Sequence, residues 1–252
     1  MSNNIIARAC LTALFMTGLL PAAAHAQQQP TEPGWPQPMN NNPLFGYAIL
    51  NQNELRMGDG DTTYRWSGEG WYGGNLNRAW FSSEGDLDTK TGELSDTEVQ
   101  ALYSRAISPF FDLQGGIRYD FGNMPGQGWA VVGVEGLAPY FFELGAHAFI
   151  SNGGQVAARL EASYDLLITQ RLILQPQAEV NFYGKTDPAR GIGSGLGDID
   201  SGLRLRYEIT RQFAPYVGVA YQSTFGQSAD FAKARGEPTS QLRFTVGIRT
   251  WF

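Results

Sequence analysis

Apolar and polar residues alternate along most of the chain with a period of two. In residues 156–166 every second position, counted from the first, is apolar, while Arg159 and Glu161 stand between the apolar positions. The same alternation recurs in residues 172–182 and 199–209. Because successive side chains of a β-strand point to opposite faces, each segment predicts a strand with one apolar face and one ionic face.

The chain after residue 44 divides into segments of this kind, separated by clusters of Gly, Pro, Asn or Asp, and none keeps a helical period. We therefore predict an all-β fold with about twelve antiparallel strands, an even number as bacterial outer-membrane barrels have. The predicted strands are residues 45–57, 62–72, 76–87, 94–107, 109–121, 128–138, 139–151, 155–167, 171–184, 198–210, 213–226 and 239–252.

The connections between the predicted strands alternate in length. Turns such as 169–170 and 210–212 are short, while connections such as 185–197 and 227–238 are longer. The glycine-rich residues 192–198 lack the features of a phosphate-binding loop and are predicted to be part of a mobile outer loop. Short turns on one rim and long loops on the other are typical of a barrel inserted from the periplasm.

The alternation alone fits two kinds of protein. In a soluble sandwich or lipocalin-like barrel the apolar face packs into a core and the ionic face meets water. In a membrane barrel the apolar face meets lipid and the charges line the lumen. After residue 26, no segment has the roughly 18 or more consecutive apolar residues that a membrane helix needs. If the protein spans a membrane, it must therefore do so as a closed barrel. The long strands, their even number and the unequal connections favour the transmembrane antiparallel β-barrel.

The first 44 residues differ in composition from the rest. Residues 1–26 contain one basic residue, an apolar run and the sequence AHA ending at Ala26, which has the form of a signal peptidase site. We predict that they are a signal peptide, cleaved near Ala26 after export. Residues 27–44 are rich in Gln, Pro and Asn and are predicted to be a flexible, disordered periplasmic arm. The outer-membrane barrel is assigned to residues 45–252.

Charge and cysteine content narrow the class further. The net charge of −6 disfavours nucleic acid as a partner. Cys10 lies in the predicted signal peptide, so the mature chain would have no cysteine for disulfides or thiolate metal ligands. The terminal Phe252 resembles the C-terminal aromatic signal that outer-membrane assembly machinery reads. We expect a monomer surrounded by outer-membrane lipid.

Several long segments resemble the barrel of the copper resistance protein B family, of the CopB/PcoB type. The likeness runs in order and spacing from about Phe45 to Phe252 and is carried by residues 65–88, 102–121, 138–151, 158–185 and 191–221. It implies an outer-membrane barrel associated with copper tolerance in Gram-negative bacteria, with copper ions as cargo and a periplasmic copper-binding protein as a partner. Typical members carry a Met- and His-rich segment before the barrel, suited to copper. In this sequence residues 27–44 offer Met39 and no histidine.

His147 is the only histidine after the predicted signal peptide. It alternates with apolar residues from Phe142 to Ile150 and should therefore face the lumen on the same side as Glu143. It could be a metal ligand or a protonatable gate, or a histidine satisfied within a polar network.

The ionic faces supply the other candidate copper contacts. The predicted weak lumen contacts are His147, Glu143, Glu161, Asp165, Glu179 and Asp200, and the methionines considered for transient contact are Met39 on the arm and Met57 and Met124 near outer connections. Weak contacts suit transit, since a tightly bound ion would not leave. Because charges of both signs lie close together in a narrow bore, opposite charges could instead pair and form a stabilising plug.

The sequence gives little support for an enzyme. A membrane hydrolase needs a nucleophile beside a base, and no G-x-S-x-G pattern is present. We therefore predict a non-enzymatic barrel that binds copper ions weakly or passes them across the membrane. The alternative is a small-solute channel or structural barrel without metal preference.

Overall fold

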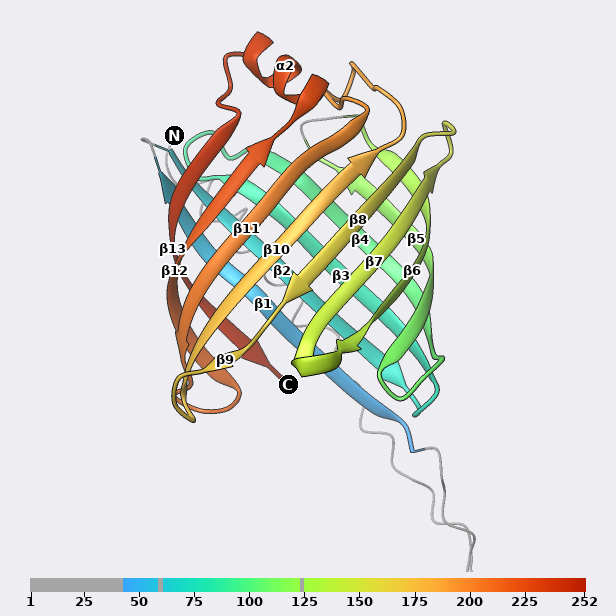
Figure 1. Ribbon diagram of the computed structural model, residues 1–252, viewed down its shortest axis with the longest axis vertical. Helices are drawn as coiled ribbons and strands as arrows, with labels where there is room; N and C mark the ends of the chain where they lie inside the picture. Colours follow the sequence, from blue (N-terminus) through green and yellow to red (C-terminus); the bar gives the residue numbers. More distant parts are fainter. Residues whose placement is uncertain (1–42, 59–60, 123–124) are drawn as a thin grey trace, which may run out of the picture. The chain divides into compact units, whose positions relative to one another are not determined.

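The alternating segments form the strands of one closed sheet. The computed structural model describes residues 43–58, 61–122 and 125–252. Its elements are β1 (Phe45–Gly58), β2 (Asp61–Gly73), β3 (Asn77–Asp88), β4 (Leu94–Ala106), β5 (Phe111–Phe121), β6 (Gln127–Ala138), η1 (Pro139–Phe141), β7 (Phe142–Ser151), β8 (Val156–Ser163), β9 (Leu166–Leu167), β10 (Leu172–Tyr183), β11 (Gly195–Tyr207), β12 (Phe213–Thr224), α2 (Gly226–Ala234) and β13 (Ser240–Trp251). Each strand pairs antiparallel with its neighbours (Figure 1).

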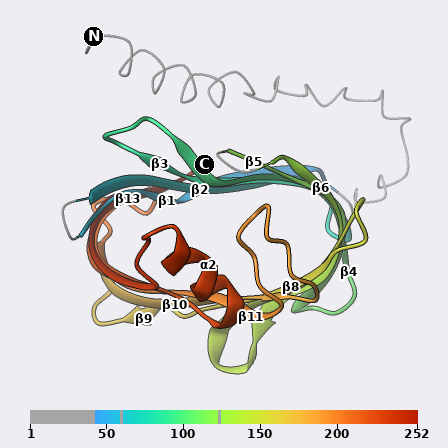
Figure 2. The same ribbon diagram turned by 90° about the horizontal axis from the view of Figure 1, so that it is seen from above.

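The barrel has twelve strands, because β8 and β9 are two parts of one interrupted strand. Both pair with β10, and the backbone N–H of Tyr164 bonds to Pro176 across the interruption at 3.1 Å. Pairing of β10 with β11 and of β13 with β1 leaves no free edge. Figure 2 shows the strands enclosing an oval bore. The predicted twelve-stranded antiparallel barrel is confirmed.

The two faces of the sheet carry opposite chemistry. Large apolar side chains such as Ile117 and Phe244 point outward and are 67% and 64% exposed. Charged side chains such as Glu54 and Arg204 point inward and are 1% and 2% exposed. This inverts the arrangement of a soluble barrel, in which burial of apolar surface drives folding. It fits a barrel whose outside meets hydrocarbon and whose charges are enclosed.

The two rims differ as the sequence predicts. Turns 74–76, 107–110 and 208–212 lie on one rim, called here the short-turn rim, and the longer connections 184–194 and 225–239 lie on the other, the long-loop rim (Figure 1). No helix in the described part of the chain is long and apolar enough to cross a membrane.

Three local predictions are wrong in part. Residues 227–238, which the sequence analysis placed among the long loops, include most of α2, a helix that it did not predict. Residues 192–198 are not all loop, because β11 begins at Gly195 and its backbone pairs with Tyr183 of β10. The strand predicted from residue 139 begins at Phe142, since η1 turns the chain there.

Strand β1 contains a bulge where the barrel closes. Its register to β2 shifts between Leu50 and Gln52, and its register to β13 shifts between Leu50 and Glu54. Below the bulge, Ala48 and Phe252 exchange two backbone hydrogen bonds of 3.0 and 2.8 Å. The bulge brings the side chains of Asn51 and Gln52 both onto the inner face, where they bond to lumen residues.

The signal peptide and most of the predicted arm lie outside the described residues. This holds for residues 1–26 and for 27–42. The division of the chain into signal peptide, arm and barrel domain therefore stays a prediction.

Candidate functional site

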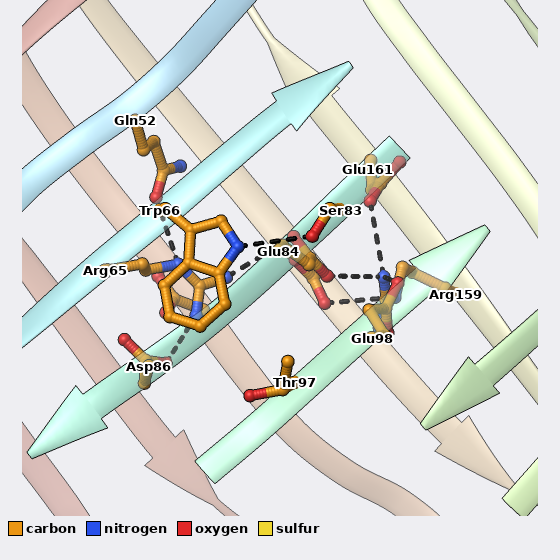
Figure 3. Close-up of polar contacts among 12 residues, drawn as sticks. Gln52, Arg65, Trp66, Ser83, Glu84, Asp86, Thr97, Glu98, Arg159 and Glu161 are labelled. Carbon is orange, nitrogen blue, oxygen red and sulfur yellow. Dashed lines mark hydrogen bonds and ion pairs between the residues drawn. The ribbon is translucent and has the colours of Figure 1, made fainter. Parts of the chain in front are cut away.

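Arg159 crosses the middle of the bore. Its guanidinium, which comes from β8, forms a bidentate pair with Glu98 of β4, in which Nη1 and Nη2 each lie 2.9 Å from a carboxylate oxygen. Nη1 also donates to Glu84 of β3 at 2.9 Å (Figure 3). Four strands separate β3 from β8 on the shorter way around the barrel. One side chain thus joins nearly opposite walls.

A second buried ionic centre surrounds Glu54 on β1. Its carboxylate accepts hydrogen bonds from Nε of Arg56 at 2.8 Å, from Nε and Nη2 of Arg204 at 2.8 and 2.7 Å, and from the Tyr216 hydroxyl at 2.8 Å. Arg56 also pairs with Asp200 at 2.8 Å. Such pairing is required because an isolated charge taken out of water is strongly destabilising.

Arg65 connects the two centres. Its Nε donates to Gln52 at 3.0 Å, and Arg56 reaches the same amide oxygen at 3.4 Å. Nη2 of Arg65 lies 3.7 Å from a carboxylate oxygen of Glu84, which also binds Arg159 (Figure 3). We call this continuous set the ion-pair layer: Glu54, Arg56, Arg65, Glu84, Glu98, Arg118, Arg159, Asp200 and Arg204.

A cavity of about 90 Å³ lies against the ion-pair layer on the side of the short-turn rim. Its lining includes Glu69, Glu84, Glu98, Glu135, Glu161, His147, Gln114 and Arg159. No salt bridge of Glu69 or Glu135 occurs within the described ranges; Glu69 accepts a hydrogen bond from Asn51 at 3.1 Å and Glu135 one from Gln114 at 2.8 Å. This lumen cavity therefore contains two carboxyl groups without an arginine partner among the described residues.

His147 enters the lumen cavity because a neighbouring strand leaves space for its ring. Gly133 of β6 lies opposite His147 of β7 in the sheet, and a β-carbon at Gly133 would overlap the imidazole. Nε2 of His147 lies 3.0 Å from the amide oxygen of Gln114. Because an amide oxygen can only accept a hydrogen bond, the imidazole proton is assigned to Nε2. Nδ1 then keeps a lone pair that could contact a cation.

Only part of the predicted copper set comes together. His147 and Glu161 line the same cavity, whereas Glu143 lies nearer the short-turn rim and accepts a hydrogen bond from Ser163 at 2.7 Å. Arginines bind the other predicted carboxylates: Arg206 binds Asp165, Arg159 binds Glu179 at 3.1 Å and Arg56 binds Asp200 at 2.8 Å.

Of the three predicted methionines only Met57 is described, and it does not line the lumen cavity. Met57 follows the outward-facing Leu55 on the apolar face of β1 and is 39% exposed. Met39 and Met124 lie outside the described residues. Across residues 43–58, 61–122 and 125–252, no group of three or more His, Cys, Asp or Glu side chains could hold a metal ion. The described part of the lumen cavity therefore contains no preassembled chelate.

Lumen residues that escaped the sequence analysis include Arg56, Asp86, Glu98 and Arg190. Arg56 and Asp86 share a strand face with Glu54 and Glu84, so the alternation could have identified them. Glu98 follows a register shift between β3 and β4, which obscures the period. Arg190 lies in a long connection, where no period applies.

The long-loop rim is covered by structured connections. Residues 184–194 and α2 lie over the opening of the bore (Figure 2). Arg190 from this connection donates to Asp120 at 3.0 Å and also binds Gln127. The hydroxyl oxygen of Ser228 on α2 accepts a hydrogen bond from the Gly193 N–H at 2.7 Å. The loop and the helix thus support one another.

A closed twelve-stranded barrel with an apolar exterior and an ionic lumen defines an outer-membrane β-barrel. The solved structure of the NanC porin superposes with a TM-score of 0.53 at 12% identity, covering 82% of this chain and 99% of the porin. That likeness concerns the fold alone.

Sequence comparison then identifies the family. The sequence model described as copper resistance protein B precursor (CopB) matches residues 44–252. Copper resistance protein B of Escherichia coli is 46% identical over 205 residues, which are 81% of this chain and 69% of that protein. A copper resistance protein B homolog of Pseudomonas syringae pv. tomato is 44% identical over 214 residues, 85% of this chain and 72% of that protein. The chain belongs to the copper resistance protein B family, and the predicted resemblance is confirmed.

Proposed function

We propose that this outer-membrane barrel contributes to copper resistance by holding copper ions weakly in the lumen cavity or passing them through it. The observation that carries the proposal is that, in a member of a copper resistance family, His147 lines the same cavity as Glu69 and Glu135, which have no arginine partner among the described residues. Imidazole nitrogen is a good ligand for copper, and the carboxylates add oxygen contacts and negative charge.

Arginine partners narrow the set of copper contacts. Asp165, Glu179 and Asp200 are bound by arginines, so a cation would have to displace a guanidinium to reach them. His147 remains, together with Glu161, whose carboxylate lies 3.9 Å from the Arg159 guanidinium and whose side chain is 42% exposed. Glu69 and Glu135 line the same cavity. Since these groups are not arranged as a chelate, we expect fast exchange, which suits transient holding or transit.

The side of access follows from the same arrangement. The lumen cavity lies between the ion-pair layer and the short-turn rim, which in this proposal faces the periplasm. A periplasmic copper-binding protein would therefore exchange copper with the barrel at that rim.

Copper binding to the purified protein tests the proposal directly. Cu²⁺ titrated into the detergent-solubilised barrel should give an electron paramagnetic resonance signal with nitrogen coupling from one imidazole. His147→Ala should abolish this coupling, and Glu161→Gln should weaken binding. Glu237→Gln, which alters an exposed outer pair, is the matched control and should bind as the wild type does. A nitrogen-coupled signal that survives in His147→Ala would exclude the lumen cavity as the site.

Cellular copper tolerance tests whether the site matters. A deletion strain should recover copper tolerance and normal cell-associated copper with the wild-type gene, and less well with the His147→Ala, Glu161→Gln double variant. Equal rescue by both genes would contradict a role of the lumen cavity.

The ion-pair layer also supports a second candidate function, a structural barrel without metal preference. Its contacts join β1, β2, β3, β4, β5, β8 and β11 and would stabilise the barrel whatever the cargo. For this candidate, deletion should lower tolerance to zinc and to detergents as much as tolerance to copper. A defect confined to copper would reject it.

A further inference from the structure

One side chain connects two walls of the bore. Arg159 contacts Glu84 and Glu98 on one wall, each at 2.9 Å, and Asn181 and Glu179 on its own side at 3.0 and 3.1 Å. Its guanidinium also lies 5.8 Å from the centre of the Phe149 ring. Bidentate pairs between arginine and carboxylate are among the strongest and most directional polar contacts in proteins.

Solvent exposure changes sharply at this level of the bore. The side chains of Arg159 and Glu98 are 9% and 5% exposed. Glu161, two residues nearer the short-turn rim on the same face of β8, has a side chain that is 42% exposed. The exposed part of the lumen cavity therefore lies on the short-turn side of Arg159, and the Arg159–Glu98 pair itself is buried.

The same contacts continue to the other side of the barrier. Glu98 also binds Arg118 at 2.6 Å, and Arg118 binds Asp120 at 2.6 Å. Asp120 in turn accepts a hydrogen bond from Arg190, which belongs to the connection over the long-loop rim. A chain of paired charges thus extends from the middle of the bore to the connection over the long-loop rim.

We infer that Arg159 is the residue that closes the bore, so that ions reach the lumen cavity from the short-turn rim and pass the barrel only when the contacts of Arg159 open. Its removal would leave Glu84 and Glu98 facing the vacated space, with Arg65 and Arg118 as their remaining partners. The opened bore would therefore favour cations over anions. This inference concerns the bore itself and does not depend on copper being the cargo.

Single-channel recording in planar lipid bilayers with potassium chloride tests the inference. The wild-type barrel should show a small conductance, and Arg159→Ala should raise it several-fold with cation selectivity. Arg159→Lys keeps the charge but cannot make the bidentate pair, and its conductance should lie between the two. The matched control is Arg78→Ala, which removes a pair with Asp112 at 3.0 Å near the short-turn rim, outside the layer. Its conductance should equal that of the wild type.

Two results would overturn the inference. One is a wild-type conductance as large as that of an open porin. The other is an unchanged conductance in both Arg159 variants, with folding verified by the shift of the unheated barrel in gel electrophoresis. If Arg159→Ala does not fold, Arg159→Lys and the wild type still decide the matter. Since no copper is present in these recordings, they are independent of the test of the proposed function.

Discussion

Glu54→Gln should destabilise the barrel more than other isosteric substitutions, because Glu54 is the shared acceptor of a buried ionic centre. The side chain has 0% exposure and accepts four hydrogen bonds of 2.7 to 2.8 Å from Arg56, Arg204 and Tyr216. The glutamine keeps the shape but removes the charge. Arg56 would keep its ion pair with Asp200, whereas Arg204 would lose its only ion pair within the described chain.

The expected loss follows from the charge left behind. Breaking a buried ion pair by removing one partner costs about 3–5 kcal/mol, because the other charge stays buried without compensation. Each hydrogen bond to a charged group contributes roughly 1.5–3 kcal/mol, but the four bonds share one carboxylate and do not add independently. We therefore expect the free energy of unfolding to fall by about 3–5 kcal/mol.

Urea unfolding in detergent micelles, followed by tryptophan fluorescence, measures this loss. Glu237→Gln is the matched control, since it removes an exposed pair with Arg235 at 2.9 Å and should change stability by less than about 1 kcal/mol. The hydrogen bond to Glu237 raises the pKa of Arg235, which is charged at neutral pH even without this shift. If Glu54→Gln were no more destabilising than this control, the buried centre would not contribute as argued.

Three further substitutions test other parts of the structure. Ile117→Lys, on the outer face of β5, should cost about 2–4 kcal/mol in lipid vesicles, whereas Leu76→Lys in a turn should cost about 0–1 kcal/mol; equal costs would contradict the lipid-facing assignment. Gly133→Ala should displace the ring of His147 and weaken Cu²⁺ binding as His147→Ala does, and unchanged binding would contradict this packing. Ser228→Ala should speed protease cleavage of residues 184–194 on intact cells, and an unchanged rate would contradict the support that α2 gives this loop.

The strands and their faces could be predicted from the sequence because both depend on local alternation. Arg204 and Arg206 face the lumen as their positions in residues 199–209 predict, and the predicted strand ends differ from the observed ones by only a few residues. Each residue on a strand has one of two faces, so the apolar pattern settles the choice.

The partners inside the bore could not be predicted in this way. Arg159 meets Glu84 from 75 residues away, and Arg56 meets Asp200 from 144 residues away. Such contacts depend on how the barrel is staggered and flattened, which periodicity does not encode. For the same reason the sequence analysis named Asp165, Glu179 and Asp200 as copper contacts together with His147, although each has an arginine partner.

Helix α2 was missed for a different reason. It has nine residues and no apolar stripe facing the barrel that a helical period would reveal; Ser228, Ala229 and Ala232 are its buried residues. Small side chains allow close packing but carry little pattern.

The seam between β1 and β13 has a consequence for how the molecule forms. These strands lie about two hundred positions apart, and the paired backbones of Ala48 and Phe252 belong to the seam. Until they meet, both carry unpaired amide groups that hydrocarbon cannot satisfy and that invite association with other chains. Spontaneous insertion should therefore be slow. A catalyst that shields both edges until β1 and β13 pair should increase the rate of assembly more than it increases the stability of the closed barrel.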